Sequence, residues 1–242
     1  KPPQVPALNG GALTARGQAI TSLPVHPRLG AVLLAGHALG IASTAATVVA
    51  LMSEMDPFRG APDAAGDGDL EPRLAAIAEA EWRGTAPAGV DRRRWNELKK
   101  VRDQLLRRVE ALDGGTAPEG PFEPLVLALL AGFPGRLGRR RDRASGRYLL
   151  ASGHGAVLKE RSLADSEFLF ALDLGSARRG AHAEHRIRLA HPVDLDLSLV
   201  PPRNELRFDA GNESVVLRRV TRIGALVLRD DQSSERPAPG ES

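Results

Sequence analysis

The sequence has no cysteine, little lysine and few aromatic residues. Without cysteine it can form no disulfide, thiolate nucleophile or cysteine zinc site, which fits the cytoplasmic location that we expect. One tyrosine and two tryptophans are too few for a nucleic-acid site dominated by base stacking, so binding would rest mainly on charge. No glycine is followed by lysine, which excludes a P-loop for ATP.

Signatures of a stand-alone enzyme and of a membrane protein are also missing. There is no Gly-x-Ser-x-Gly elbow, no dinucleotide fingerprint, and no nucleophile that the sequence would pair with a base. The most apolar run, residues 38–52, is too short to cross a bilayer, and no signal peptide is visible, so we expect no membrane partner. The first residue is Lys rather than Met, and we therefore expect a piece of a longer protein.

Arginine supplies nearly all of the positive charge. The 242 residues include 29 arginines and four lysines, yet the net charge is only +3. A GC-rich coding sequence explains this overall bias, together with the abundance of alanine, glycine and proline. A functional interpretation is therefore kept for places where arginines gather locally.

The first half of the chain has helical periodicity. Residues 91–112 give the clearest pattern, with an apolar stripe from Trp95 through Leu105 to Leu112 and basic residues outside it. Residues 70–82 and 43–55 also read as helices, and the almost wholly apolar residues 124–133 predict a central helix. His26, between two prolines at a helix start, is expected to cap or pack rather than to act as a base.

Beyond about residue 146 the period changes from helix to strand. "GRYLLASGHGAVL" predicts a hairpin, and further short strands follow until about residue 230. The predicted fold class is α+β: an N-terminal helical bundle followed by a small OB-like antiparallel β-barrel. The expected domains are a bundle over residues 25–135, a barrel over residues 136–230 and a flexible tail over residues 231–242.

Between these halves lies an arginine cluster, in which Asp142 is the only acid. The cluster consists of Arg136, Arg139, Arg140, Arg141, Arg143 and Arg147. One interpretation is a site for phosphates, because a guanidinium donates two parallel hydrogen bonds. The other is a solvated joint between two structural units. Tyr148, which begins an apolar strand, is expected to lie in the core.

The sequence contains two weaker candidate sites. Arg92 and Arg93 occupy the first turn of a predicted helix, where the helix dipole disfavours positive charge, so they are secondary candidates for an anion contact. His182 and His185, with Glu184 and His191, suggest a metal site. They fall on a loop entering a strand, however, and we expect no metal there.

The order of several motifs resembles a known family. "LTARGQAITSLPVHPRLGAVLL" is similar to the DEAH-box helicase segment in which the winged helix passes into the helicase-associated bundle. The matching residues are Leu13, Thr14, Gly17, Leu23, Pro24, His26, Pro27, Arg28 and Leu29. "SEMDPFRG", "LLAGFPGRLGRRR", "RIRLAHPVD" and "LRRVTRIGALVL" then resemble the bacterial HrpB-type branch in the same order.

This resemblance implies a piece of an ATP-dependent RNA helicase. Residues 1–24 would be the end of the winged helix, and the bundle and barrel would form one side of a channel for single-stranded RNA. The two RecA-like motor domains, which would bind ATP and Mg²⁺ and dock on this region, have no counterpart in the sequence. We therefore expect no cofactor in this chain and no ATP hydrolysis by it alone.

A protein-interaction module is the alternative function. In that case the chain would dock on motor domains or an adaptor without touching RNA. If the arginine cluster faces a concave surface shared by bundle and barrel, RNA is favoured. A dominant flat apolar patch would instead favour a protein partner.

Overall fold

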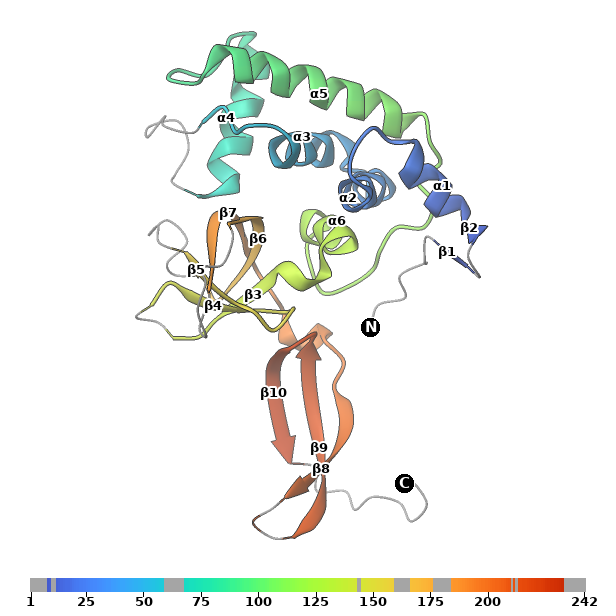
Figure 1. Ribbon diagram of the computed structural model, residues 1–242, viewed down its shortest axis with the longest axis vertical. Helices are drawn as coiled ribbons and strands as arrows, with labels where there is room; N and C mark the ends of the chain where they lie inside the picture. The colour runs from blue at the N-terminus through green and yellow to red at the C-terminus, as the bar shows by residue number, and fades with distance from the viewer. Residues whose placement is uncertain are drawn as a thin grey trace.

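The computed structural model describes residues 8–9, 12–58, 68–142, 145–158, 166–175, 184–209, 211 and 213–232. In it a layer of helices covers a small β-barrel, and a separate sheet extends away from the barrel (Figure 1). The α+β fold class predicted from the sequence is confirmed.

Six helices form the first half of the described chain. They are α1 (Ala15–Ser22), α2 (Pro27–Ala38), α3 (Ala42–Ser53), α4 (Leu70–Arg83), α5 (Arg92–Glu110) and α6 (Pro124–Gly132), after the short strands β1 (Leu8–Asn9) and β2 (Ala12–Leu13). Capping side chains start four of them: Thr14, His26, Asp69 and Asp91 each accept a backbone N–H of the first turn. His26 thus has the capping role expected for it.

The central helices are held together by small and apolar residues. Trp95, Leu98 and Leu105 of α5 are buried, as their spacing predicted. A Cβ on Gly132 would lie 2.2 Å from the carbonyl oxygen of Arg28, so the glycine permits the close approach of α6 to α2. None of the helices in the described part of the chain is both long and apolar enough to cross a membrane.

A closed barrel of five strands follows the 3-10 turn η1 (Pro134–Arg136). Its strands are β3 (Leu137–Arg140), β4 (Arg147–Leu150), β5 (Gly155–Leu158), β6 (Phe168–Leu174) and β7 (His185–Val193), in the order β3-β4-β5-β7-β6. The barrel is OB-like in strand number and closure. It differs from the expectation in one respect, because β5 and β7 pair in parallel.

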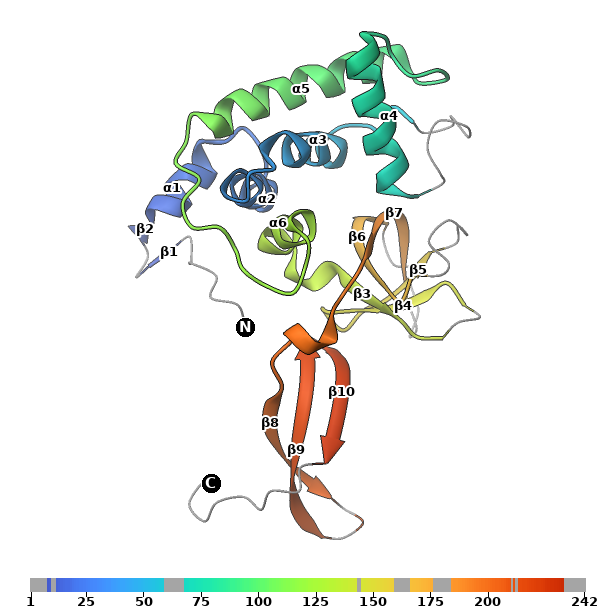
Figure 2. The same ribbon diagram turned by 180° about the vertical axis from the view of Figure 1, so that it is seen from behind.

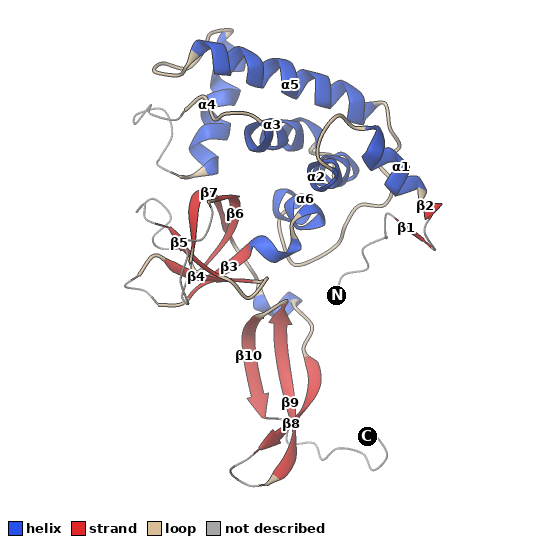
Figure 3. Cartoon of the chain, in the orientation of Figure 1, coloured by secondary structure: helices blue, strands red, loops and turns tan. Residues whose placement is uncertain are grey.

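The remaining strands form a second sheet rather than more barrel. After η2 (Leu197–Leu199), strands β8 (Arg203–Asp209), β9 (Ser214–Ile223) and β10 (Leu226–Gln232) pair in the order β10-β9-β8 (Figure 3). The barrel expected over residues 136–230 is therefore shorter. The β3–β6 pairing closes the barrel and leaves no edge to which β8 could add.

The expected ends of the chain are only partly described. Residues 1–7, 10 and 11 and residues 233–242 lie outside the described residues, whereas Asp231 and Gln232, expected in the tail, belong to β10. The other expected domain boundaries, including the end of a winged helix over residues 1–24, stay predictions.

Helices and barrel share one apolar core. Leu129 of α6, Leu137 of β3 and Phe170 of β6 are fully buried in the same cluster, which runs from the helix layer onto the outer wall of the barrel. A second, smaller cluster fills the barrel interior around Tyr148. The arginine cluster thus begins where a continuous core joins the two parts.

Candidate nucleic-acid interface

The arginine cluster runs from η1 through β3 to the start of β4, and its members lie in different environments. Arg136 and Arg139 make contacts within the fold, Arg140 is half-buried, and Arg141 and Arg147 are exposed. Arg143 lies outside the described residues. The sequence alone treats these positions as equivalent, but the structure does not.

Arg136 lies against the end of α6. Its guanidinium carbon is 4.2 Å from the centre of the Phe133 ring, and one of its N–H groups donates to the carbonyl oxygen of Leu172. Burial and, to a smaller extent, the charge of Arg28 lower the pKa of Arg136, while Asp173 opposes this shift. A second arginine therefore lies close enough to Arg136 for the two charges to repel.

Arg139 connects the barrel to the second sheet. Its guanidinium lies 3.0 Å from a carboxylate oxygen of Glu167 and donates to the carbonyl oxygen of Val227 at 3.0 Å. These contacts occupy the side chain with structural partners. Arg139 is consequently a weaker candidate for binding a ligand than its place in the cluster suggested.

Arg140, Arg141 and Arg147 lie on paired strands and their connecting turn. The guanidinium of Arg140 lies 5.9 Å from the Tyr148 ring centre. The exposed Arg141 donates its backbone N–H to the carbonyl oxygen of Arg147 at 2.9 Å, and the exposed side chain of Arg147 lies 3.3 Å from a carboxylate oxygen of Glu184. Arg141 and Arg147 are therefore the described members of the cluster that face solvent at this edge of the barrel.

Strand register adds an arginine that the sequence argument did not select. Arg147 pairs with Val157, and Val157 pairs with Arg186 on β7, so the three side chains lie in one row across the outer face of the barrel. Arg186 is exposed. The alternation of arginine with Ile187 and Leu189 in the sequence could have indicated this exposed arginine. Alternation of this kind was taken only as evidence for a strand.

A pocket of 290 Å³ opens where the helices meet the barrel. It is lined from α2, α6 and η1 by Arg28, Phe133, Pro134, Gly135 and Arg136, and from the barrel by Leu150, Ser152, His154, Leu174 and His185. We call this the joint pocket. Arg28 and the two histidines were not predicted as site residues, because nothing local in the sequence connects them to Arg136.

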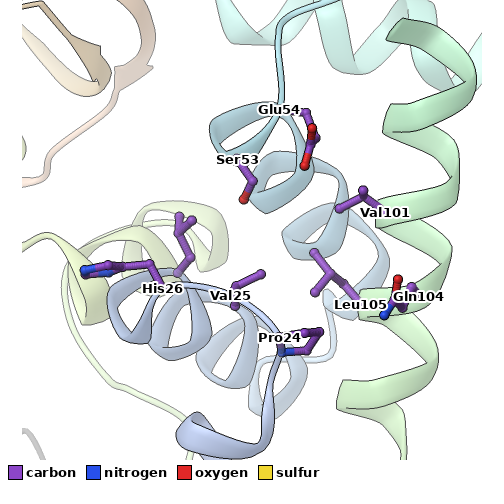
Figure 4. Close-up of a pocket in the computed structure, with 9 residues that line it drawn as sticks. Pro24, Val25, His26, Ser53, Glu54, Val101, Gln104 and Leu105 are labelled. Atoms are coloured by element: carbon purple, nitrogen blue, oxygen red, sulfur yellow. The ribbon is translucent and has the colours of Figure 1, made fainter. Parts of the chain in front are cut away.

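A larger pocket, of 360 Å³, lies within the helical layer (Figure 4). Val101 and Leu105 project from α5 toward Val25 and the end of α3, where Ser53 and Glu54 lie. Neither arginine nor lysine lines this pocket. It therefore offers no cation to a phosphate.

Arg92 and Arg93 are exposed in the first turn of α5, and the backbone N–H of Arg93 donates to Asp91. This helix lies on the side of the helical layer away from the barrel in both views (Figures 1 and 2). The structure does not bring these two arginines together with the arginine cluster. As contacts to nucleic acid they stay a prediction.

Tyr148 and the candidate metal site remain to be placed. Tyr148 is fully buried, as expected, and its hydroxyl donates to the carbonyl oxygen of Ser166 at 3.3 Å. His182 lies outside the described residues. Among those that the structure describes, no group of three or more histidine and carboxylate side chains could hold a metal ion.

Comparisons with known proteins agree with the resemblance seen in the sequence. Residues 26–106 match the family model described as the helicase-associated domain (HA2), ratchet-like. The chain is 32% identical over 233 residues to the ATP-dependent RNA helicase HrpB of Escherichia coli (strain K12). The aligned region covers 92% of this chain and 25% of that protein.

Solved structures give the same result. Crystal structures described as the E. coli DExH-box NTPase HrpB and the Escherichia coli DEAH/RHA helicase HrpB both match with a TM-score of 0.64, at 26% and 25% identity. They cover 96% and 97% of this chain, and the chain covers 26% of each. The chain thus spans about a quarter of the length of these relatives. The predicted resemblance is confirmed: residues 26–106 match an HA2 helicase-associated domain, and the chain as a whole is similar to the accessory region of HrpB-type helicases.

Proposed function

We propose that this chain guides single-stranded RNA in an ATP-dependent HrpB-type helicase. The observation that carries the proposal is the joint pocket, which is shared by helices and barrel and lined by Arg136 of the arginine cluster. A concave, positively charged surface at this joint is what an RNA-guiding region requires. The arginine cluster contributes one residue, Arg136, to this concave surface, which supports RNA over a protein partner.

Exposed arginines on the barrel add positive charge outside the pocket. OB-type barrels bind oligonucleotides on the face of their second and third strands and on the loop between the first two. Here those elements are β4, β5 and the β3–β4 turn, which carry Arg147 and Arg141. Contacts from these side chains would hold phosphates without reading sequence.

In this proposal the chain acts passively. The RecA-like motor domains of the same polypeptide bind ATP and Mg²⁺ and supply the movement that draws the strand along. The shared core around Leu129 and Leu137 keeps helices and barrel in fixed relation, so the strand would pass a rigid wall. The chain itself would hydrolyse no ATP.

Binding of a fluorescent polypyrimidine RNA across a salt series tests the proposal. The double variant Arg141→Gln/Arg147→Gln should bind more weakly, and its log–log salt slope should be shallower by about 1.4, since each lost contact to a single strand removes about 0.7. Lys99→Gln/Lys100→Gln removes the same charge from exposed positions on α5 and should bind like the parent chain. Equal binding by all three proteins would contradict the role given to these arginines.

Docking on the motor domains is a second function, favoured by a different observation. Leu206, Phe208 and Val215 are exposed on one face of the β8–β9 pair, where Phe208 and Val215 are register partners. We propose that the motor domains of the same polypeptide cover this face, since about three quarters of the relatives' length lies outside the matched region. Hydrogen exchange in β8 and β9 should slow when this region is joined to its motor domains, and unchanged exchange would contradict the docking role.

A further inference from the structure

The joint pocket holds two like charges beside one aromatic ring. The guanidinium carbons of Arg28 and Arg136 lie 5.9 Å and 4.2 Å from the centre of the Phe133 ring. Arg28 comes from the first turn of α2, and Arg136 from the turn that leads into β3. Two separate parts of the fold thus bring cations to the same place.

Within the described part of the chain, neither arginine has a carboxylate within ion-pair distance. The carboxylate that acts on Arg136, Asp173, is already bound to Arg188 at 2.8 Å. Burial and, to a smaller extent, the charge of Arg28 lower the pKa of Arg136, so the two like charges repel each other in this pocket. A bound anion would relieve that repulsion.

The barrel side of the pocket adds hydrogen-bonding groups. The rings of His154 and His185 are perpendicular, with their centres 5.6 Å apart. The Nδ1 of His185 lies 3.1 Å from the carbonyl oxygen of Gly175 and so donates to it, which leaves Nε2 for another partner. The Nδ1 of His154 lies 3.1 Å from the hydroxyl oxygen of Ser152.

Apolar walls and size limit what can occupy the pocket. Leu150, Leu174 and Phe133 line it beside the charged groups, and apolar walls strengthen a charge-assisted contact by lowering the local dielectric. At 290 Å³ the pocket lies at the lower end of ligand sites, which range from about 300 to 1,000 Å³. That volume suits one phosphate with its adjoining sugar rather than a free dinucleotide.

We propose that the joint pocket seats one phosphodiester of the guided RNA strand, with Arg28 and Arg136 binding the phosphate and His154 contacting the adjoining nucleotide. This inference rests on the proposed function and adds Arg28 and His154 to it. Since the ligands come from α2, η1 and the barrel, the bound phosphate would bridge the helical layer and the barrel.

Arg28→Gln is the sharpest variant, because among the described contacts the Arg28 side chain makes only the cation–π approach to Phe133. Its folding can be verified by circular dichroism. With a polypyrimidine 10-mer at low salt we expect binding about tenfold weaker, the size of one lost charge-assisted hydrogen bond, and a salt slope shallower by about 0.7. Arg136→Lys, which keeps the charge but loses the planar fork, should also weaken binding. Lys99→Gln is the control for charge.

The NMR resonances of the imidazole carbon-bound protons of His154 and His185 give a second readout, which should shift when the 10-mer is added. If the parent chain binds RNA while Arg28→Gln binds equally well and neither histidine resonance moves, this inference is wrong and the proposed function stands. If the parent chain, correctly folded, binds no RNA, both are wrong. Weakened binding together with the shifts would support both.

Discussion

The barrel and the β8–β10 sheet are built from the same alternation of apolar and polar residues, but the barrel buries its apolar face and the sheet leaves apolar side chains exposed. Tyr148 of the barrel is 0% exposed, whereas Phe208 of the sheet is 67% exposed. The barrel closes on itself, and helices cover one side of its outer wall. The sheet turns a charged face to one side, where Arg218 meets Asp230 at 2.6 Å, and leaves apolar residues open on the other. Alternation therefore predicts strands, but it does not predict which of their apolar side chains the rest of the fold covers.

The largest expected effect comes from opening the barrel core. Tyr148→Ala should lower the free energy of unfolding by about 3–5 kcal/mol, the usual cost of removing a buried aromatic ring. Urea denaturation followed by circular dichroism measures this. Tyr148→Phe keeps the ring and loses the hydrogen bond to Ser166, so it should cost about 1 kcal/mol. Equal stability of Tyr148→Ala and the parent chain would show that the barrel is not a cooperative core.

The next effect concerns the turn that attaches the sheet to the barrel. Gly224 has φ of 57°, and a Cβ there would lie 2.4 Å from the carbonyl oxygen of Ala151, which accepts the N–H of Ala225 at 2.9 Å. Gly224→Ala should cost about 1–3 kcal/mol through backbone strain and the broken contact. Hydrogen exchange in β9 and β10 should rise with it.

Gly84→Ala is the matched control for this variant. Gly84 ends α4 with φ of 68°, and a Cβ there would meet no atom within 4 Å. Gly84→Ala should therefore lower the free energy of unfolding only through the strain of a positive φ, and hydrogen exchange in β9 and β10 should stay unchanged. If both variants lose equal stability, the contact with Ala151 contributes nothing to holding the sheet.

A smaller effect is expected where Arg139 bridges the two regions. Arg139→Gln loses the ion pair with Glu167 and the bond to the carbonyl oxygen of Val227. Because the side chain is partly exposed, the expected cost is about 1 kcal/mol. Faster hydrogen exchange confined to β10 would mark the loosened sheet. Arg229→Gln, which removes an exposed pair with Asp231 inside the same strand, should leave both quantities near their parent values.

The smallest effect on stability should come from the open face. Phe208→Ser should change the free energy of unfolding by less than about 0.5 kcal/mol, since the ring is exposed. We expect the parent chain to self-associate as its concentration rises in sedimentation velocity, and Phe208→Ser to do so less. Trp82→Ser, at an isolated position that is 85% exposed, should not reduce association. A parent chain that stays monomeric would contradict self-association through the exposed apolar face of β8 and β9.

Local patterns in the sequence were sufficient for the helices and for the position of the joint. The stripe through Trp95 and Leu105 fixed α5 because every partner in that pattern lies within a few residues. The end of the helical bundle predicted at residue 135 falls within η1 of the described chain. The fully buried Tyr148 followed from its place at the start of an apolar strand.

Long-range partners explain what the sequence did not reveal. Arg136 and Arg139 looked alike, yet their contacts with Leu172 and Val227 join residues 36 and 88 positions apart. The joint pocket likewise gathers Arg28 and His185 from opposite halves of the chain. The separation of β8 from the barrel depended on β3 pairing with β6, and no spacing within either strand indicates that pairing.

The turn at Gly224 lies at the attached end of the β8–β10 sheet, so the sheet can act as a lever arm. Strand β9 has ten residues, which corresponds to a length of about 30 Å, and the sheet is fastened to the barrel near one end by Ala225 and Arg139. A rotation of about 10° at this fulcrum would swing the far tip by about 5 Å, roughly one strand spacing. Motion of a partner held at the tip would thus reach the junction of helices and barrel reduced in amplitude and increased in force.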